Sequence, residues 1–225
     1  RYNADGTPAG GETVVNVTTT FTQFDPAVAT IAAGTAGFPS GGYVVVYTSD
    51  VGDASADGIV MQRFATAGTP VGNELTVNTT TANNQGAADV AVLNSGLIAV
   101  TYDSSSSADV FVRVLNPDGT EAVAELELDP GLSSRNPVIA ATADGGFVVA
   151  WEDTSGRDGS GVGIVAQRID ASGAPAGDSF VVNEQFSSTQ SEVEVIGLED
   201  GRFVIGWRDI VGTDELFAQV YSATG

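Results

Sequence analysis

Nine aspartates recur in four short, turn-like stretches of the chain, and these side chains are the first candidates for chemistry. Oxygen ligands from several carboxylates, held on tight turns, suit a hard cation such as Ca²⁺. The sequence therefore predicts metal sites at these loops, with calcium as the expected cofactor. The residues are Asp50, Asp53, Asp57, Asp103, Asp109, Asp153, Asp158, Asp209 and Asp214.

A second interpretation of the same loops stays open. Asp and Gly are also preferred in ordinary turns, where they supply local hydrogen bonds and positive φ angles. None of the loops has the Asp-x-Asp-x-Asp-Gly spacing with a later glutamate that marks an EF-hand. The loops are either calcium sites or the solvated turns of an acidic protein.

The composition excludes several kinds of chemistry. The 225 residues contain 8 basic residues, all arginine, and 29 acidic ones, which gives a formal charge of −21. Lysine, histidine and cysteine are absent, which excludes disulfides, imidazole or thiol metal ligands, and nucleophiles that need those groups. A field this negative repels phosphate backbones and anionic lipid, so we expect no nucleic-acid partner and no membrane insertion.

Carboxylates alone can hydrolyse a glycoside, because that reaction needs only a pair of Asp or Glu side chains. Here, however, carboxylates are so abundant that any pair is uninformative. An active site also usually requires one repeat unit to diverge, and the second unit diverges only toward serine, at residues 104–107. We therefore expect that the protein is not an enzyme, and a glycoside-cleaving enzyme remains a distant alternative.

The strands expected to position these aspartates can be located from an internal repeat. An apolar segment ending in an aromatic residue occurs four times, at Tyr47, Tyr102, Trp151 and Trp207, which lie 55, 49 and 56 residues apart. Each copy is followed by a second strand-like anchor and a turn glycine. We count repeats at about 1–62, 63–112, 113–167 and 168–219, with a partial copy at 220–225, in a single domain spanning 1–225.

Each repeat holds four strand-like runs; the third has them at 137–141, 146–151, 163–169 and 180–183. Four strands in about 50 residues, with no helical period, are typical of a β-propeller blade. The fold class predicted is all-β, a four-bladed propeller of four-stranded antiparallel blades. The last unit lacks a fourth strand, so we expect residues 12–16 to close its blade; a slice of a longer array is the alternative.

Other repeated residues are expected to hold the blades together. Gln23, Gln85 and Gln190 precede the first strands, where they either bind a sugar or hold the inter-blade connection, and we favour the second. The aromatic residues that end the second strands are expected to pack between blades. We expect each arginine of the third strands, Arg63, Arg113 and Arg168, to pair with a carboxylate while its stem covers apolar surface.

The repeats resemble a degenerate module of large secreted bacterial proteins, the RTX or hemolysin-type calcium-binding proteins and adhesins. The closest match is residues 144–170, with an Asp-Gly-Gly-Phe-Val-Val-x-Trp run and a Gln-Arg anchor, followed by Gly173, Gly177 and Asn183. The glycine-rich nonapeptide of true RTX β-rolls is absent, so that calcium fold is not carried over.

This resemblance implies a function without an active site. We expect a non-enzymatic structural or adhesive module, secreted or on the bacterial cell surface, stabilised by calcium. Its expected partners are a cell-surface glycan or protein receptor and neighbouring domains of a larger chain. A lectin-like propeller with repeated sugar sites is the alternative. The sequence identifies neither the receptor nor the oligomeric state.

Overall fold

The computed structural model describes residues 2–53, 56–105, 108–186, 188–211 and 213–225. These residues form fifteen strands in four antiparallel sheets, which we call blades 1 to 4 in chain order. Blade 1 contains β1 (Gln23–Ile31), β2 (Gly42–Ser49), β3 (Gly58–Ala65) and β4 (Leu75–Thr76). Blade 2 contains β5 (Gln85–Val92), β6 (Ile98–Ser104), β7 (Asp109–Leu115) and β8 (Glu121–Leu128).

The second half of the chain repeats this plan with one strand fewer. Blade 3 contains β9 (Ser134–Ala141), β10 (Phe147–Asp153), β11 (Gly163–Ile169) and β12 (Phe180–Val181). Blade 4 contains β13 (Thr189–Gly197), β14 (Phe203–Val211) and β15 (Thr213–Tyr221). Within the described ranges, no helix has the length and apolar character needed to cross a bilayer.

The middle strands form because both of their faces are covered. All seven residues of β10 and of β11 are buried, and such strands are nearly continuous apolar runs rather than alternating ones. The aromatic residues at the ends of the second strands lie in the cores between blades, as predicted. Tyr102 packs toward blade 1, Trp151 toward blade 2 and Trp207 toward blade 3.

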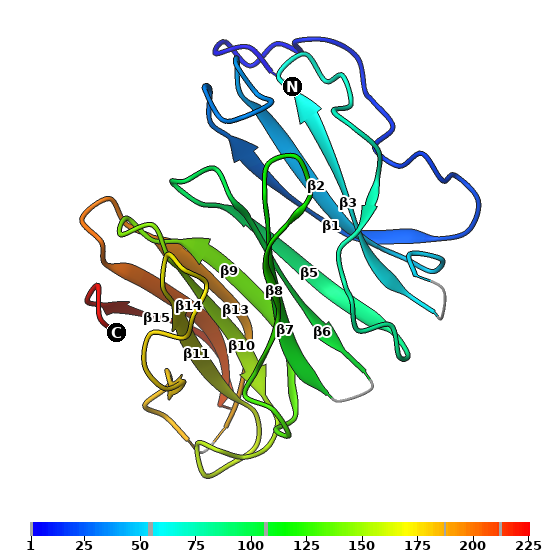
Figure 1. The fold of residues 1–225 in the computed structure, drawn as a ribbon. Coiled ribbons are helices and arrows are strands. Elements are labelled where there is room, and N and C mark those ends of the chain that lie inside the picture. Colours follow the sequence, from blue (N-terminus) through cyan, green and yellow to red (C-terminus); the bar gives the residue numbers. More distant parts are fainter. Residues whose placement is uncertain (1, 54–55, 106–107, 187, 212) are drawn as a thin grey trace.

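The sheets follow one another in chain order, from blade 1 in blue and cyan to blade 4 in orange and red (Figure 1). Consecutive blades contact each other through their first strands, β1 with β5, β5 with β9, and β9 with β13. The predicted all-β, propeller-like fold of four antiparallel blades is confirmed. The strands predicted for the third repeat are also confirmed, whereas the repeat boundaries fall inside blades because repeats were counted from third-strand anchors.

Asparagine–glutamine pairs join consecutive blades. Asn78 Nδ2 donates to Gln85 Oε1 at 3.1 Å, and Asn183 Nδ2 donates to Gln190 Oε1 at 3.2 Å. Each pair links the end of one blade to the first strand of the next. The prediction that these glutamines hold the inter-blade connection is therefore confirmed.

The predicted closure of blade 4 by residues 12–16 does not occur in this structure. In the described part of the chain, β15 pairs only with β14, and residues 12–16 are in no strand. They lie beside blade 1, where Asn16 Nδ2 donates to Gln23 Oε1 at 3.0 Å and the Val17 amide donates to Glu74. Asn16 thus makes the same junction bond to the following blade as Asn78 and Asn183 do, but not, within the described residues, the bond to the third strand of the preceding blade that those two residues also make.

Candidate functional site

Each first strand is interrupted by a β-bulge at the same position opposite its second strand. One residue of every bulge has a positive φ angle although it is not glycine: Asp25 at 49°, Ala87 at 48°, Asn136 at 49° and Glu192 at 54°. This conformation costs roughly 1 kcal/mol or more per residue. Bulges change the direction of side chains and are frequent beside functional sites. The residues around the four bulges are therefore candidates for a functional site.

Carboxylates from the second strands bond to two of these bulges. Asp103 Oδ2 accepts the backbone N–H of Asn136 at 3.0 Å, and Glu152 Oε1 accepts the backbone N–H of Glu192 at 3.0 Å. Asp103 and Glu152 each follow the aromatic residue of the second strand, so they occupy equivalent places in blades 2 and 3. The corresponding residues of blades 1 and 4 are Thr48 and Arg208.

These contacts continue from blade to blade as one chain of polar groups, which we call the bulge network. Hydrogen bonds and ion pairs carry it from blade 2 to blade 4, and Asp25 of blade 1 belongs to it through the effect of its charge on Asp103. It contains four carboxylates and two guanidinium groups. Its members are Asp25, Asp103, Arg135, Asn136, Glu152, Glu192 and Arg208.

Glu152 is fully engaged in this network. The residue is 3% exposed. Its Oε2 accepts Arg135 Nε at 2.9 Å and Asn136 Nδ2 at 3.2 Å, while Oε1 accepts the Glu192 amide. A buried carboxylate with an arginine and two further donors is held in place. Glu152 therefore has a structural role, joining blades 3 and 4.

Asp103 has a different environment. Burial raises the pKa of its carboxyl above the ordinary value of 3.8, the Asn136 amide and Arg135 lower it, and the charge of Asp25 raises it further. Its Oδ1 lies beside Gly86 of β5, where an added Cβ would come within 3.7 Å. In the described structure, only Oδ2 of Asp103 has a hydrogen-bond donor. One oxygen thus stays available, beside a second carboxylate, and the pKa is shifted in the direction that favours the protonated acid.

At the blade 4 end, the network is closed by an arginine. Arg208 Nη1 contacts Glu192 Oε1 at 2.6 Å, and Nη2 contacts Asp214. This pair of contacts fixes Glu192, which is exposed, against its neighbour. Asp214 was predicted as a metal ligand, but the structure places it in an ion pair.

Two of the predicted metal ligands support the asparagines of the blade junctions. Asp53 Oδ2 accepts Asn78 Nδ2 at 2.9 Å, and Asp158 Oδ2 accepts Asn183 Nδ2 at 3.0 Å. Asp158 also caps its own turn through the Ser160 amide. These two equivalent aspartates orient the amides that hold consecutive blades.

Asp153 and Asp209, which are equivalent residues, are both buried. Asp153 Oδ1 accepts the amide and hydroxyl of Ser155. Asp209 accepts the Ser188 hydroxyl and Gln190 Nε2, the latter at 3.2 Å. Asp153 thus fixes the start of the loop that follows β10, whereas Asp209 holds the beginning of β13.

The remaining predicted ligands are spread over three separate surroundings. Asp50 follows β2 and has one buried oxygen that lacks a partner within the described residues. Asp57 uses its main-chain carbonyl, which accepts the Gln85 amide at 2.9 Å. Asp109 begins β7, is buried, and shares a hydrogen bond with Glu127 that raises the pKa of Glu127.

No group of three or more acidic side chains close enough to hold a metal ion occurs among the residues that the structure describes. Within this part of the chain, six of the nine aspartate carboxylates accept hydrogen bonds or ion pairs from neighbouring groups instead: Asp53, Asp103, Asp153, Asp158, Asp209 and Asp214. Calcium binding at the loops stays a prediction. Among the third-strand arginines, Arg113 pairs with Glu121 and Arg168 with Asp144, as predicted, whereas Arg63 donates to the Pro117 carbonyl.

No known protein-family profile and no curated protein sequence matches the chain. Solved structures do match, and the likeness covers most of the chain. The α-L-arabinanase of Penicillium chrysogenum, complexed with arabinobiose, matches with a TM-score of 0.60 and 11% identity over 88% of this chain. Bacillus subtilis levansucrase matches with a TM-score of 0.57 and 10% identity over 90% of this chain.

A third similar structure is the exo-β-1,3-galactanase of Phanerochaete chrysosporium with β-1,3-galactotriose, at a TM-score of 0.52 and 13% identity over 89% of this chain. The chain spans 62% of the arabinanase, 69% of the levansucrase and 48% of the galactanase. At these identities the likeness establishes the fold, a propeller-like arrangement that these carbohydrate-active enzymes share.

These matches correct three predictions. The RTX or hemolysin-type resemblance is wrong, because the structural neighbours are glycoside hydrolases of propeller type and none of the comparisons points to calcium-binding repeats or adhesins. The non-enzymatic, adhesive function is contradicted by the same neighbours. The exclusion of an enzyme is also wrong. Its reasoning rested on the absence of lysine, histidine and cysteine and on the near equivalence of the repeats. Glycoside cleavage needs only a pair of carboxylates, and Asp103 and Glu152, at equivalent places in two repeats, have different surroundings.

Little in the sequence pointed to the bulge network. Asp103 was assigned to a loop although it lies within β6, and Asp25, Arg135 and Glu192 were not singled out. The missing signal is the bulge itself, since Asp25-Pro and Asn136-Pro resemble each other but Ala87-Ala and Glu192-Val do not follow that pattern. The usable signal was that the residue after each second-strand aromatic differs in every blade, against an otherwise regular repeat.

Proposed function

We propose that the bulge network is a carbohydrate-cleaving site, and that the protein hydrolyses glycosidic bonds with Asp103 as the proton donor and Asp25 as the second carboxylate. The observation that carries the proposal is the environment of Asp103. Its pKa is raised by burial and by Asp25, and its Oδ1 stays available beside Gly86. Glycosidases need one carboxyl kept protonated and one ionised, with their surroundings setting the difference.

The proposed roles follow from exposure. Asp25 is exposed on β1 and takes the role of the second carboxylate. Asp103 donates its proton to the glycosidic oxygen as the bond to the anomeric carbon breaks. Asp25 acts in one of two ways. It either accepts a proton from a water that attacks the anomeric carbon, or it bonds to the anomeric carbon itself, and water then hydrolyses that bond. The anomer of the first product distinguishes these two courses.

Other members of the network position this pair. Arg135 and Asn136 adjoin both Asp103 and Glu152. Since Arg135 is about half exposed at its side chain, it can also donate to sugar hydroxyls. A polysaccharide is the proposed substrate class, and arabinan, β-1,3-galactan and levan are the first to test, in view of the structural neighbours.

The test is sugar release from these polysaccharides by the wild-type chain and by Asp103→Asn. We expect release by the wild type and a loss of about 100-fold or more in kcat for Asp103→Asn, the size typical of a general acid. Glu194→Gln is the matched control, because Glu194 is an exposed carboxylate on β13 outside the network, and it should retain activity. Equal rates for Asp103→Asn and wild type, or no release from any of these polysaccharides, would overturn the proposal.

A further inference from the structure

Within the described residues, blade 4 has three strands, and the outer edge of β15, where a fourth strand would pair, is open. We call this edge, and the equivalent edges of the other blades, the seat of the fourth strand. In blades 1 and 3, the third strand pairs on its outer side with a short fourth strand, Val60 opposite Thr76 and Val165 opposite Val181. The equivalent residue of β15 is Phe217, since it lies opposite Trp207 as Val60 lies opposite Tyr47. Within the described ranges, that edge of β15 is unpaired.

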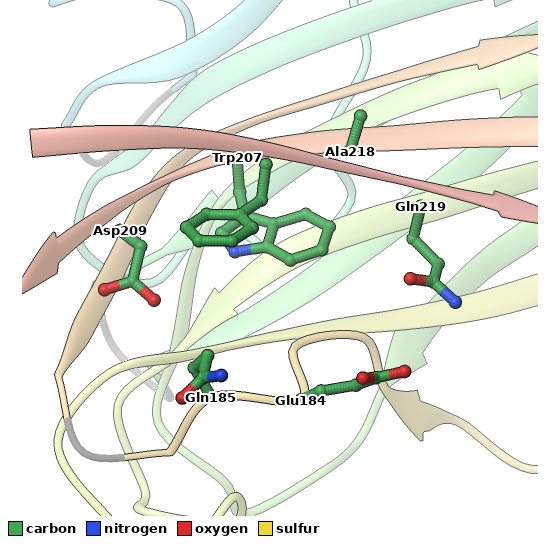
Figure 2. A pocket seen from close by; sticks show the side chains of 7 residues that line it. Glu184, Gln185, Trp207, Asp209, Ala218 and Gln219 are labelled. Carbon is green, nitrogen blue, oxygen red and sulfur yellow. The ribbon is translucent and has the colours of Figure 1, made fainter.

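A pocket of about 110 Å³ marks this seat. It is lined by Trp207, Asp209, Phe217, Ala218 and Gln219 of blade 4 and by Glu184 and Gln185, which follow blade 3. Glu184 and Gln185 lie across the opening from Trp207 and Gln219 (Figure 2). The indole Nε1 of Trp207 is buried and has no hydrogen-bond partner among the described residues, and the same holds for that of Trp151 in blade 3, where the fourth strand has no glutamate at the equivalent position. A buried donor without an acceptor is unfavourable.

The corresponding seats of blades 1 and 2 show which groups fill such a space. The Tyr47 hydroxyl donates to Glu74 at 2.6 Å, and Glu74 also accepts the amide of Val17. The Tyr102 hydroxyl donates to Glu125, which accepts the Thr79 amide at 2.6 Å. In both blades a glutamate before the end of the fourth strand satisfies the second-strand aromatic and the amide of the preceding connection.

A second contact recurs at the end of the fourth strand, where an asparagine accepts a third-strand amide. Asn78 lies four residues after Glu74, and its Oδ1 accepts the amide of Ile59 at 2.8 Å. Asn183 Oδ1 likewise accepts the amide of Ile164 at 2.8 Å. The residue of β15 equivalent to Ile59 is Leu216, which is 85% exposed.

The chain itself carries a segment with these groups. Residues 12–16 begin with Glu12 and end with Asn16, at the same four-residue spacing as Glu74 and Asn78. Val15 corresponds to Val77, which is 0% exposed, and to Val182, which is 3% exposed. On its own blade 1 this segment is held by few contacts, and Val14 and Val17 are 71% and 72% exposed.

We propose that blade 4 is completed by residues 12–16 of a second copy of this chain, which add to β15 as an antiparallel fourth strand. Val14 then lies opposite Phe217, Glu12 accepts the indole N–H of Trp207, and Asn16 Oδ1 accepts the amide of Leu216. Strand addition of this kind draws its affinity from main-chain hydrogen bonds and its specificity from alternate side chains. A second copy is favoured over an unrelated peptide because every group that the seat lacks is present in this segment.

The first test is the mass of the intact chain in solution as a function of concentration. We expect a concentration-dependent dimer, strengthened by salt because each copy carries a formal charge of −21. Val15→Asp should weaken the dimer about tenfold or more, since it places a charge at a buried position. Val14→Asp, its matched control, alters an exposed position of the same segment and should change the dimer much less.

The second test addresses the seat. A peptide of residues 11–17 that carries a fluorescent label is added to the intact chain, and the fluorescence anisotropy of the label is followed. We expect binding that Trp207→Phe weakens and that Trp151→Phe leaves unchanged, since blade 3 has its own fourth strand. A monomer at every concentration, including one in which residues 12–16 close the ring of their own chain, would overturn the proposal. So would a peptide that does not bind.

Discussion

Asp103 and Glu152 occupy the same place in two consecutive blades and have opposite surroundings. Each follows the aromatic residue of a second strand and accepts the bulge amide of the next blade at 3.0 Å. Glu152 has an arginine and an amide on its other oxygen. Asp103 has a glycine there, and burial raises its pKa. The fold supplies the position, and the neighbours decide whether the carboxylate holds blades together or is available for chemistry.

The largest effect on stability is expected from Glu152. Replacing it with alanine removes a buried charge that satisfies Arg135, Asn136 and the Glu192 amide, so we expect a loss of about 3 kcal/mol in the free energy of unfolding. Urea unfolding measures this. Asp103→Ala, the equivalent change in blade 2, should cost much less because its carboxyl has one hydrogen-bond donor. Equal losses would mean that the two carboxylates have the same role.

The neighbouring residue extends the comparison. Tyr102 precedes Asp103 and donates to Glu125, a charged acceptor, whereas Tyr221 donates to the neutral Val182 carbonyl at 3.2 Å. We expect Tyr102→Phe to lower the unfolding free energy by about 2 kcal/mol, and Tyr221→Phe by about 1 kcal/mol or less. Thermal or urea unfolding of the two variants tests this order, and a reversed order contradicts the assignment of Glu125 as the anchor of blade 2.

Alkaline pH provides a smaller effect. Burial, then the hydrogen bond and charge of Glu125, raise the pKa of Tyr102 well above its ordinary 10.0. The unfolded tyrosine ionises at pH values where the folded one does not, so stability is fully present below pH 10 and decreases as the pH rises beyond it. In Tyr102→Phe this decrease should be shallower between about pH 10 and 11. An unchanged slope would contradict the raised pKa.

The smallest effect concerns the charge on Asp103. Because its pKa is raised in the fold, the ionised form is less favourable there than in the unfolded chain. Its contribution to stability is therefore present at pH values below 3.8 and is lost as the pH rises through the folded pKa. At pH 7, Asp103→Asn should be as stable as the wild type or slightly more stable. A clear destabilisation would mean that Asp103 holds the blades, as Glu152 does.

Much of the fold could be predicted from the sequence. The repeated apolar runs ending in Tyr47, Tyr102, Trp151 and Trp207 located the second strands, and the glutamine series located the blade junctions. The closing strand was misplaced because Glu12 and Asn16 match every fourth-strand segment equally well. A local pattern identifies the kind of strand but not which blade receives it.

The site was harder to predict for a physical reason. Its residues come together at bulges whose positive φ angles fall on Asp25, Ala87, Asn136 and Glu192, and no local propensity marks those positions. The acidic loops attracted attention because Asp and Gly recur there. In the structure, Asp53 and Asp158 orient junction asparagines, which a count of carboxylates does not reveal.

The contrast with Glu152 depends on Asp103 having one available oxygen and a raised pKa. The most direct measurement is the titration of the Asp103 side-chain carboxyl by ¹³C NMR, in the wild-type chain and in Asp25→Asn. We expect the pKa of Asp103 to lie above 3.8 in the wild type. In Asp25→Asn it should be lower, because the neighbouring negative charge is removed. A carboxyl that titrates at or below 3.8, or one that does not respond to Asp25→Asn, would contradict this expectation.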